Sequence, residues 1–431
     1  MFALVLGLLA AGCVDTAKTS AAPLPATASL AEASGLSPDD EIDGLDLAVA
    51  TNGDVHLVWR ERIGAYGDPG GERVVYRRGH GNPLRWSAPL VVTTGDSGEP
   101  RVAVTAQGVH VLAGPGLRHW LLRTGSDAFV DIGNVLSGRA TAAALEVVAI
   151  GDRVVIVFVA SEASDPQGIH AVTWSAAAGP TAPVLIAAAT GATGSVDTAP
   201  ALHPIDGRLM AVWSENTFTV THDERTRATV HVPSARVRAA WSEDAGFGWG
   251  PPTEVTPTPP TSGVRAVAAA GAAGAPLAFF TALGLFGSRW SKGAWTEPVR
   301  IAAYEPGSLA GSAETSEVAA AQCGGHTVVA WVDARLRRSD RRWWNPLGGF
   351  PWSDNPDWHN NDLFVAMRMD LDAAAIQPIR LTSGASFTGD IAIAPRGNAL
   401  LVLRAGRAAV RKSPGDAGAP PVILQSQLAC D

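Results

Sequence analysis

The sequence predicts an all-β protein built as a β-propeller of four-stranded antiparallel blades, with seven blades favoured. Three observations lead to this prediction. Glycine and proline are frequent, at 46 and 30 of 431 residues; 46% of residues are hydrophobic and only 17% charged; and one apolar motif recurs seven times. Frequent glycine and proline imply many turns, while the composition excludes both a disordered chain and a long coiled coil. The recurring motif predicts a repeated structural unit.

The recurring motif is a turn followed by an apolar run that often ends in an aromatic residue. The first copy is Gly53–Trp59 and the last is Gly397–Leu403, and the ends of successive copies are about 57 residues apart on average. The copies between them are Gly108–Ala113, Arg153–Phe158, Gly207–Trp213, Ala275–Phe280 and Gly325–Trp331. A run that is apolar throughout needs cover on both faces. Each copy is therefore expected to be the buried second strand of a blade.

Three further runs complete each repeat. A short β-type run precedes the motif, beginning at Leu45, Arg101, Leu145, Pro200, Val264, Glu317 and Asp390. A third run follows it, as at Tyr76 or Trp241, and in the last repeat at Ala408. Proline announces a fourth run in six repeats, at Pro89, Pro183, Pro252, Pro298, Pro378 and Pro421. Because proline cannot donate to a strand ladder, the fourth strand is expected at the outer edge.

Seven such units predict a closed propeller, because an open sheet of about 28 strands exceeds the size at which sheets stay open. Six blades with one irregular copy are the alternative.

The N-terminus carries a targeting signal. Residues 1–12 form an apolar run that ends at Cys13 and is shorter than the roughly 20 residues that cross a bilayer. Leu9–Cys13 (LAAGC) resembles the lipobox of bacterial lipoproteins. The resemblance implies a signal peptide at residues 1–12, a lipid on Cys13 and, with Val14 next, sorting to the outer membrane of the cell envelope. An ordinary secretory signal is the alternative.

The domain organisation follows from composition. Residues 13–40 are rich in Ala, Ser, Thr and Pro and have little to bury, which predicts a flexible tether. Residues 41–431 are expected to form the propeller.

One segment resembles a motif of sialidases. Ser242, Asp244, Gly246 and Trp249 are spaced as in the Asp-box of bacterial neuraminidase repeats, where the polar side chains cap turn amides and glycine permits positive φ. Trp331–Arg335 with Asp362–Phe364 is also similar to a pattern of sialidase-like exported propellers. The resemblance implies a sialidase-like blade frame and a structural Asp-box turn opposite the active face.

Sialidase catalysis is not predicted. True sialidases have six blades, an early Arg-Ile-Pro segment, three arginines that grip the substrate carboxylate and a Tyr-Glu nucleophile pair. This chain has no Arg-Ile-Pro, and Tyr304 is its only late tyrosine.

The face that carries the connections between second and third strands is the predicted functional face. Long insertions concentrate there, at Arg60–Glu72, Glu215–Ser234 and Asp333–Asn361. The last insertion supplies the predicted ligand-binding residues Arg335, Trp343, Trp344, Trp352, Trp358 and His359, because exposed aromatic rings suit stacking on sugars or gripping a peptide. A small core private to the loop is the alternative. Glu61, Glu215 and Asp333, which follow second strands, are candidate catalytic carboxylates for a glycosidase.

Acidic residues near the first-strand entries form a second pattern. Asp46, Glu99, Asp197, Glu317 and Asp390 are placed to ring the central channel. Such a ring could bind Ca²⁺, although ordinary loop polarity explains the pattern as well, and no metal or other cofactor is predicted.

The two late cysteines are not expected to pair. Export permits a disulfide. However, Cys323 follows a first strand and Cys430 follows a predicted last strand, and these strands end on opposite faces.

The net charge of −8 excludes a basic surface for nucleic acid. Together, the lipobox, the repeats and the loop insertions predict a monomeric surface lipoprotein that binds a glycan or protein without catalysis through the loop-bearing face. A sialidase-like glycoside hydrolase is the alternative.

Overall fold

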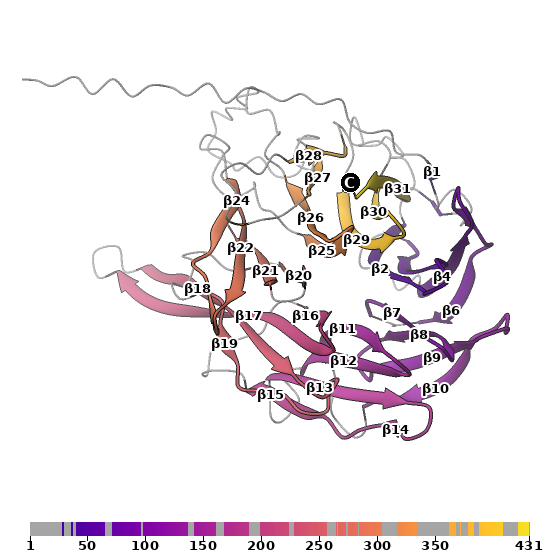
Figure 1. Ribbon diagram of the computed structural model, residues 1–431, viewed down its shortest axis with the longest axis horizontal. Coiled ribbons are helices and arrows are strands. Elements are labelled where there is room, and N and C mark those ends of the chain that lie inside the picture. Colours follow the sequence, from indigo (N-terminus) through magenta and orange to yellow (C-terminus); the bar gives the residue numbers. More distant parts are fainter. Residues whose placement is uncertain are drawn as a thin grey trace, which may run out of the picture.

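The protein is a ring of seven blades around a common axis, seen end-on in the computed structural model (Figure 1). The structure describes residues 28–29, 36–37, 40–64, 71–95, 98–136, 142–160, 168–188, 199–223, 228–256, 264, 266–272, 275–282, 284–303, 317–333, 362–367, 371, 378–382, 388–407 and 421–430. All regular structure among them is β-strand, and none of them forms an apolar helix that could cross a membrane. The all-β, seven-bladed prediction is confirmed, and the six-bladed alternative is wrong.

Six blades follow chain order from the axis to the rim. Blade 1 consists of β2 (Glu41–Val49), β3 (Val55–Arg62), β4 (Glu72–His80), β5 (Arg85–Trp86) and β6 (Leu90–Thr94). Blade 2 consists of β7 (Arg101–Thr105), β8 (Gly108–Ala113), β9 (Arg118–Arg123) and β10 (Val130–Asn134). Blade 3 consists of β11 (Ala142–Ile150), β12 (Arg153–Ala160), β13 (Gly168–Ser175), β14 (Gly179–Pro180) and β15 (Val184–Ala188). Blade 4 consists of β16 (Ala201–Ile205), β17 (Arg208–Asp223), β18 (Ala228–Ser242) and β19 (Thr253–Glu254); blade 5 of β20 (Ala266–Ala272), β21 (Ala275–Ala282), β22 (Gly284–Ser291), β23 (Ala294–Trp295) and β24 (Val299–Ala303); and blade 6 of β25 (Val318–Cys323), β26 (His326–Asp333), β27 (Asp362–Ala366) and β28 (Ile379–Arg380). Every predicted second strand is found at its place.

Blade 7 closes the ring with both ends of the chain. Its strands are β29 (Thr388–Arg396), β30 (Ala399–Arg407), β31 (Pro421–Ala429) and, outermost, β1 (Ala28–Ser29). The strand that begins at Pro421 is therefore a third strand, and its prediction as a fourth strand is wrong; the run at Ala408 lies outside the described residues. The fourth strand comes from the segment that composition assigned to the tether, with Ala28 opposite Gln425.

This register also explains why the expectation that the two late cysteines do not pair is wrong. Cys323 and Cys430 form a disulfide, with their Cα atoms 5.5 Å apart. In an antiparallel blade, first and third strands run in the same direction and end on the same face. Cys323 ends the first strand of blade 6, and Cys430 directly follows the third strand of blade 7. The expectation that the two lie on opposite faces was wrong because it took β31 for a fourth strand.

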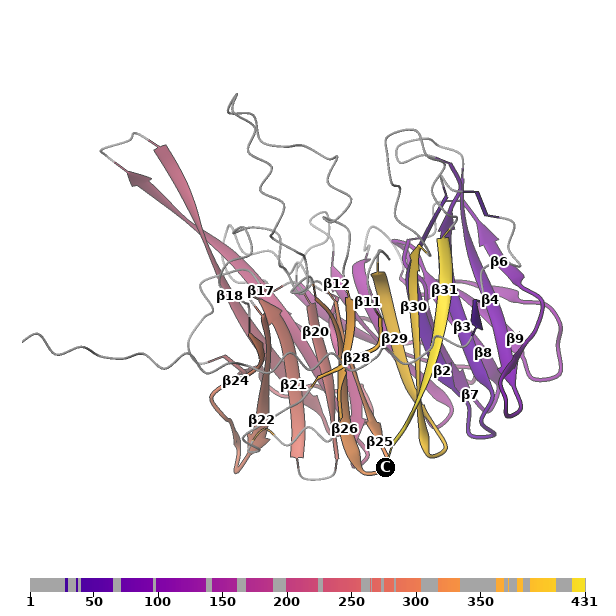
Figure 2. The ribbon, with the colours of Figure 1, turned by 90° about the horizontal axis from the view of Figure 1, so that it is seen from above.

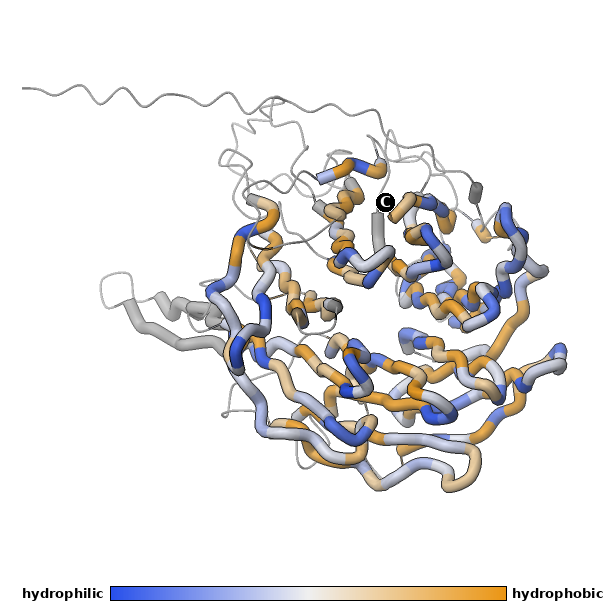
Figure 3. The backbone as a smooth tube through the Cα atoms, viewed as in Figure 1, coloured by the Kyte–Doolittle hydropathy of each residue, from blue (hydrophilic) through white to orange (hydrophobic). Residues whose placement is uncertain are grey.

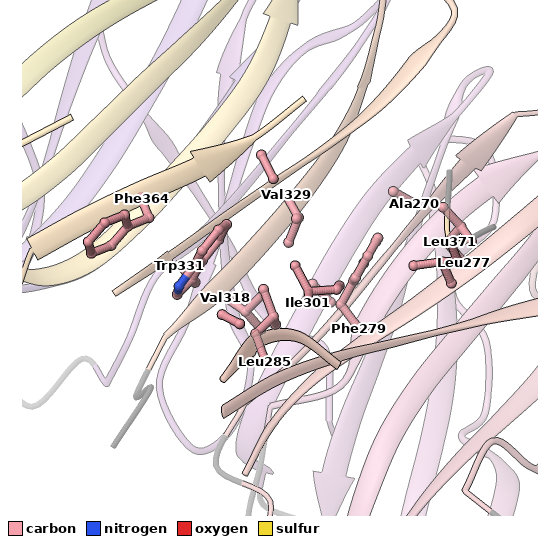
Figure 4. Packing of buried hydrophobic residues seen from close by; sticks show 13 residues of the cluster. Ala270, Leu277, Phe279, Leu285, Ile301, Val318, Val329, Trp331, Phe364 and Leu371 are labelled. Atoms are coloured by element: carbon pink, nitrogen blue, oxygen red, sulfur yellow. The ribbon is translucent and has the colours of Figure 1, made fainter. Parts of the chain in front are cut away.

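The core is divided among the junctions between blades. Among the described residues there is one buried apolar cluster at each of the seven junctions, so each second strand packs on both sides. The tube in Figure 3 shows apolar residues along the strands where neighbouring blades face each other. Figure 4 shows the junction of blades 5 and 6, where the fully buried Trp331 ring stacks on Phe364 with centroids 5.8 Å apart.

The ring has two distinct faces. On the hairpin face, first strands join second strands in short turns such as Ala50–Asp54 and Gly397–Asn398; on the long-loop face, second strands lead to third strands. In Figure 2 the long-loop face is uppermost and the C-terminus lies at the hairpin face. Glu215–Ser234, predicted as a loop insertion, is instead a continuous extension of β17 and β18, paired as far as Asp223 and Ala228, and it projects from the long-loop face (Figure 2).

Candidate functional site

A cavity of about 410 Å³ lies on the axis where the first strands begin, and we call it the channel mouth. Residues from the first strands of all seven blades line it. Because first strands begin on the long-loop face, the channel mouth opens toward the face that sequence analysis singled out. Its ionisable lining residues are Asp46, Glu99, Arg101, Glu146, Glu317 and Asp390.

Sequence analysis found four of these six residues. Asp197 lies outside the described residues, and Glu146 and Arg101 were missed. Glu146 follows Leu145 in β11 as Asp46 follows Leu45 in β2, so the repeat register could have revealed it. Arg101 is the first residue of its strand, and no pattern in the sequence separates it from ordinary surface arginines.

The arginine is already engaged by carboxylates. Arg101 Nε donates to Glu146 Oε2 at 3.1 Å, and its guanidinium lies 3.6 Å from Glu99 Oε2. Burial alone would lower the pKa of Arg101, but the surrounding carboxylates, Glu146 first, raise it above its ordinary value. The channel mouth therefore has five carboxylates and one arginine that is permanently charged and paired.

Two carboxylates accept backbone hydrogen bonds that fix them in place. Asp46 Oδ2 accepts the N–H of Val102 at 2.6 Å, which ties blade 1 to blade 2. Asp390 Oδ2 accepts the N–H of Leu45 at 3.3 Å, which ties blade 7 to blade 1. These bonds fix the separation of the side chains around the axis.

Burial and mutual repulsion make Asp46, Glu146, Glu317 and Asp390 weak acids. Burial, helped by the charge of Asp46, raises the pKa of Glu146 to about 7 against the opposing effect of Arg101. Burial together with Asp390 and Glu99 raises the pKa of Glu317 to about 8. The pKa values of Asp46 and Asp390 are also raised, with burial the largest cause. Near neutral pH the channel mouth thus offers both protonated carboxyls, which donate, and carboxylates, which accept.

The remaining lining is small and apolar. Blades 4 and 5 contribute Ala199–Leu202 and Ala266–Ala269. The channel mouth therefore has a polar side from blades 1, 2, 3, 6 and 7 and an apolar side from blades 4 and 5. In the part of the chain that the structure describes, no three acidic, histidine or cysteine side chains come close enough to hold a metal ion, so the Ca²⁺ alternative has no ligand set there.

The candidate catalytic carboxylates Glu61 and Glu215 lie elsewhere, at the ends of second strands in blades 1 and 4. Glu61 is fully buried, and it accepts hydrogen bonds from Trp59 Nε1 at 2.8 Å and Arg73 Nε at 2.5 Å.

Glu215 repeats this arrangement. It is 3% exposed, and its Oε1 accepts from Trp213 Nε1 at 3.2 Å and from Arg238 at 3.0 Å. Residues two apart in a strand share a face, so tryptophan and carboxylate pair within the blade. The side chain of Asp333, third in this pattern, lies outside the described residues. The structure does not bring Glu61 and Glu215 together, and it buries each against a tryptophan and an arginine.

The predicted ligand-binding residues Arg335, Trp343, Trp344, Trp352, Trp358 and His359 all lie outside the described residues, as does Cys13. The connection 334–361, which contains the six predicted binding residues, follows β26 and precedes β27 at the long-loop face.

The Ser242–Trp249 turn lies on the hairpin face, away from the channel mouth, and its side chains hold the turn together. Ser242 Oγ donates to Asp244 Oδ1 at 2.9 Å and accepts from Gly246 N at 2.8 Å, while Gly248 N donates to Asp244 Oδ1 at 2.7 Å. The Gly248 N–H leads the contacts that lower the pKa of Asp244. Trp249 packs against the cluster between blades 3 and 4. The turn therefore joins two blades and is placed to be structural.

A larger cavity of about 840 Å³ opens on the hairpin face among blades 1, 2 and 3. Its central polar groups pair with each other: Tyr76 Oη lies 2.8 Å from His56 Nδ1, and Arg78 donates to Asp54 at 2.5 Å. Burial lowers the pKa of His56 to about 4, so the ring is neutral. The channel mouth is the better candidate site because five carboxyl groups share a single arginine there and because it opens toward the long-loop face.

The chain was compared with known families, curated proteins and solved structures. No family model and no curated protein matches the chain. Similar solved structures include a protein of unknown function from Dyadobacter fermentans, with 12% identity, 91% of this chain and 95% of that chain covered, and a TM-score of 0.49. A mutant of NanB sialidase from Streptococcus pneumoniae has 12% identity, with 92% and 69% covered and a TM-score of 0.45. Trypanosoma rangeli sialidase in complex with sialic acid has 13% identity, with 89% and 54% covered and a TM-score of 0.44. With identities of 12–13% and TM-scores below 0.5, these likenesses carry no conclusion about this chain.

Proposed function

We propose that the protein is an exported, lipid-anchored propeller that binds a glycan or protein ligand without catalysis through its long-loop face. The observation that carries the proposal is the channel mouth: a cavity of about 410 Å³, bordered by fixed acids and one arginine, at the face that also bears the 334–361 connection. Concave sites with a few convergent polar groups are the usual form of ligand sites.

The charge of the channel mouth favours a neutral or cationic ligand. Five carboxylates surround a single arginine whose guanidinium already contacts Glu146 and Glu99. A carboxylate-bearing sugar such as sialic acid would meet repulsion and no free bidentate partner. Sugar hydroxyls, or an amine on an apolar stem lying along the alanine-rich side, fit the polar and apolar halves.

Non-catalytic binding is favoured because two of the three candidate glycosidase residues are otherwise occupied. Glu61 and Glu215 are buried, and both accept hydrogen bonds from a tryptophan and an arginine. A catalytic carboxyl must reach the glycosidic oxygen or the anomeric carbon of a bound substrate, which a buried and paired group does not.

A second candidate function, glycoside hydrolysis at the channel mouth itself, rests on one observation. The pKa of Glu146 is raised to about 7 beside the ionisable Asp46, and a carboxyl that is partly protonated at neutral pH suits general acid catalysis. Sugar release from a panel of aryl glycosides, lost in Glu146→Gln, would support hydrolysis. Absence of turnover across the panel would leave binding.

Residues 1–13 are the basis for proposing export and membrane anchoring. Cys13 would carry the lipid, and the outer membrane would be the destination. We propose that the protein is a monomer. The Cys323–Cys430 disulfide supports export, because structural disulfides persist in oxidising compartments and are rare in the cytosol. We further propose that the Ser242–Trp249 turn is a sialidase-type Asp-box.

The binding proposal is tested with the mature protein on arrays of glycans and peptides. We expect a defined set of bound probes, and we expect deletion of Leu336–Asn360 to abolish binding while the far-ultraviolet spectrum and melting temperature stay unchanged. Identical binding profiles for the deletion variant and the parent protein would refute a role for this loop. Asp152→Asn, on the hairpin face and with a 68% exposed side chain, is the matched control that should bind normally.

A further inference from the structure

We propose that the hairpin face lies against the membrane surface, so that the channel mouth opens away from the lipid. This inference rests on the proposed anchor at Cys13 and deepens it, because it assigns the surface that meets the membrane. Three independent features support it: the direction of β1, the exposed side chains of blades 3 and 4, and the distribution of charge.

The direction of β1 sets where the tether joins the ring. β31 runs from the long-loop face at Pro421 to the hairpin face at Ala429, since Ala429 pairs with Ala399 beside the β29–β30 turn. β1 is antiparallel to β31, with Ala28 opposite Gln425 and Ser29 opposite Leu424. β1 therefore runs toward the long-loop face, and its N-terminal residue, Ala28, lies at the end of β1 that is nearer the hairpin face.

The length of that chain permits the same orientation. Fourteen residues, 14–27, separate Cys13 from Ala28. A flexible chain of this length spans about 20 Å on average. The nine residues of β31 cover about 30 Å between the faces, and β1 pairs with its middle. From the middle of β31 either face is about 15 Å away and within this span, but a tether bound for the hairpin face continues the line of β1, whereas one bound for the long-loop face must first reverse direction.

Exposed aromatic and basic side chains lie on the hairpin face at the other side of the ring. Phe247, in the β18–β19 connection, is 43% exposed and is the only aromatic among the exposed large hydrophobic residues of the described chain. The Arg153 guanidinium lies over its ring at 4.8 Å, and Arg208 lies over Trp241 at 5.0 Å. Pairs of an aromatic ring and a long cation suit the lipid headgroup region. Together with the tether at blade 7, they give contacts on both sides of the ring.

Charge separates the two faces. At the channel mouth five carboxyl groups surround one arginine, and an anionic leaflet would repel those that are ionised at neutral pH. On the hairpin face cations and anions balance within pairs such as Arg78 with Asp54 and Arg208 with Glu243. Contact with an anionic membrane surface therefore costs less electrostatic free energy at the hairpin face than at the long-loop face.

The test measures the height of each face above the membrane. The lipidated full-length protein is placed in vesicles of phosphatidylethanolamine and phosphatidylglycerol that carry a headgroup energy acceptor. A donor dye is attached to Thr51→Cys on the hairpin face or Thr94→Cys on the long-loop face; both positions are exposed in blade 1, next to blade 7. With Cys13 lipidated and the other two cysteines in a disulfide, the new thiol is the only free one.

We expect energy transfer from Thr51→Cys to exceed that from Thr94→Cys at least about twofold, because an eight-residue strand separates the positions by about 27 Å. Phe247→Ser should reduce this difference, and Val91→Ser, 46% exposed on β6, should not. Equal transfer, or more from Thr94→Cys, in vesicle-bound protein would overturn the orientation and leave the anchor standing. Failure of the protein to float with vesicles would overturn both.

Discussion

Removal of the Cys323–Cys430 disulfide should destabilise the whole ring. The bridge joins residues 107 apart and ties the first strand of blade 6 to the end of blade 7. Closing a loop of this length in the unfolded chain corresponds to about 4.8 kcal/mol on the chain-entropy model. At about 2.1 cal/mol/K of unfolding entropy per residue, a propeller of roughly 390 residues should lose about 6 °C in melting temperature.

The assay is thermal unfolding followed by tryptophan fluorescence and far-ultraviolet circular dichroism. The double variant Cys323→Ala with Cys430→Ala should melt about 6 °C below the wild type, and reductant should lower only the wild-type melting temperature. Both cysteines are almost fully buried, so the reduced wild type, which keeps both sulfur atoms, separates loss of the crosslink from loss of packing. A shift below about 1 °C, or alkylation of both thiols in the unreduced protein, would refute the reasoning.

Three further predictions concern buried charge. First, burial lowers the pKa values of His110 and His119, which contact each other at 3.0 Å, to about 3 and 4. Their neutral forms stabilise the folded state above about pH 6.5, and this stability should be lost as the pH falls toward 4. The denaturant midpoint should therefore fall less steeply with decreasing pH in His119→Gln than in the wild type. Equal slopes in the two proteins would contradict the prediction. Second, the raised pKa of Glu317, about 8, means that its contribution to stability is present below about pH 4.5 and lost as the pH rises through 8. Glu317→Gln should therefore be more stable than the wild type at pH 9 and similar to it at pH 5, and a destabilised variant at pH 9 would speak against a buried acid. Third, Glu61→Ala leaves Trp59 and Arg73 without their acceptor and should lower the free energy of unfolding, measured with urea, by about 3 kcal/mol. A decrease below about 0.5 kcal/mol is not compatible with a buried ion pair.

The local pattern predicted the fold well wherever burial dictates sequence. Second strands such as Arg153–Phe158 are covered on both faces, so their residues are continuously apolar and visible in the sequence. The prolines before β6, β15 and β24 mark outer strands for the equally local reason that they cannot donate to a ladder.

Blade 7 was misassigned because its outer strand comes from the other end of the chain. The pairing of Ala28 with Gln425 spans almost the entire sequence, and no local signal in a two-residue strand reveals it. The error propagated to the cysteines, since the face on which Cys430 lies depends on whether β31 is third or fourth in its blade.

The candidate site was predicted in part. The acidic entries of the first strands were visible because the repeat aligns them, and the same alignment of Leu145 with Leu45 would have added Glu146. The burial of Glu61 and Glu215 could not be predicted for a physical reason: an acid after an apolar strand resembles a loop residue, and only the neighbouring third strand supplies the arginine that pairs with it.

The most direct test of the central claim, that ligand binds at the channel mouth, is isothermal titration of an array-selected ligand into the wild type, Glu146→Gln and Asp152→Asn. If the ligand binds at the channel mouth, the affinity of Glu146→Gln should be at least about tenfold weaker than that of the wild type, a loss of about 1.4 kcal/mol of binding free energy. The affinity of Asp152→Asn should be unchanged. An unaltered Kd for Glu146→Gln, or a loss confined to Asp152→Asn on the opposite face, would contradict it.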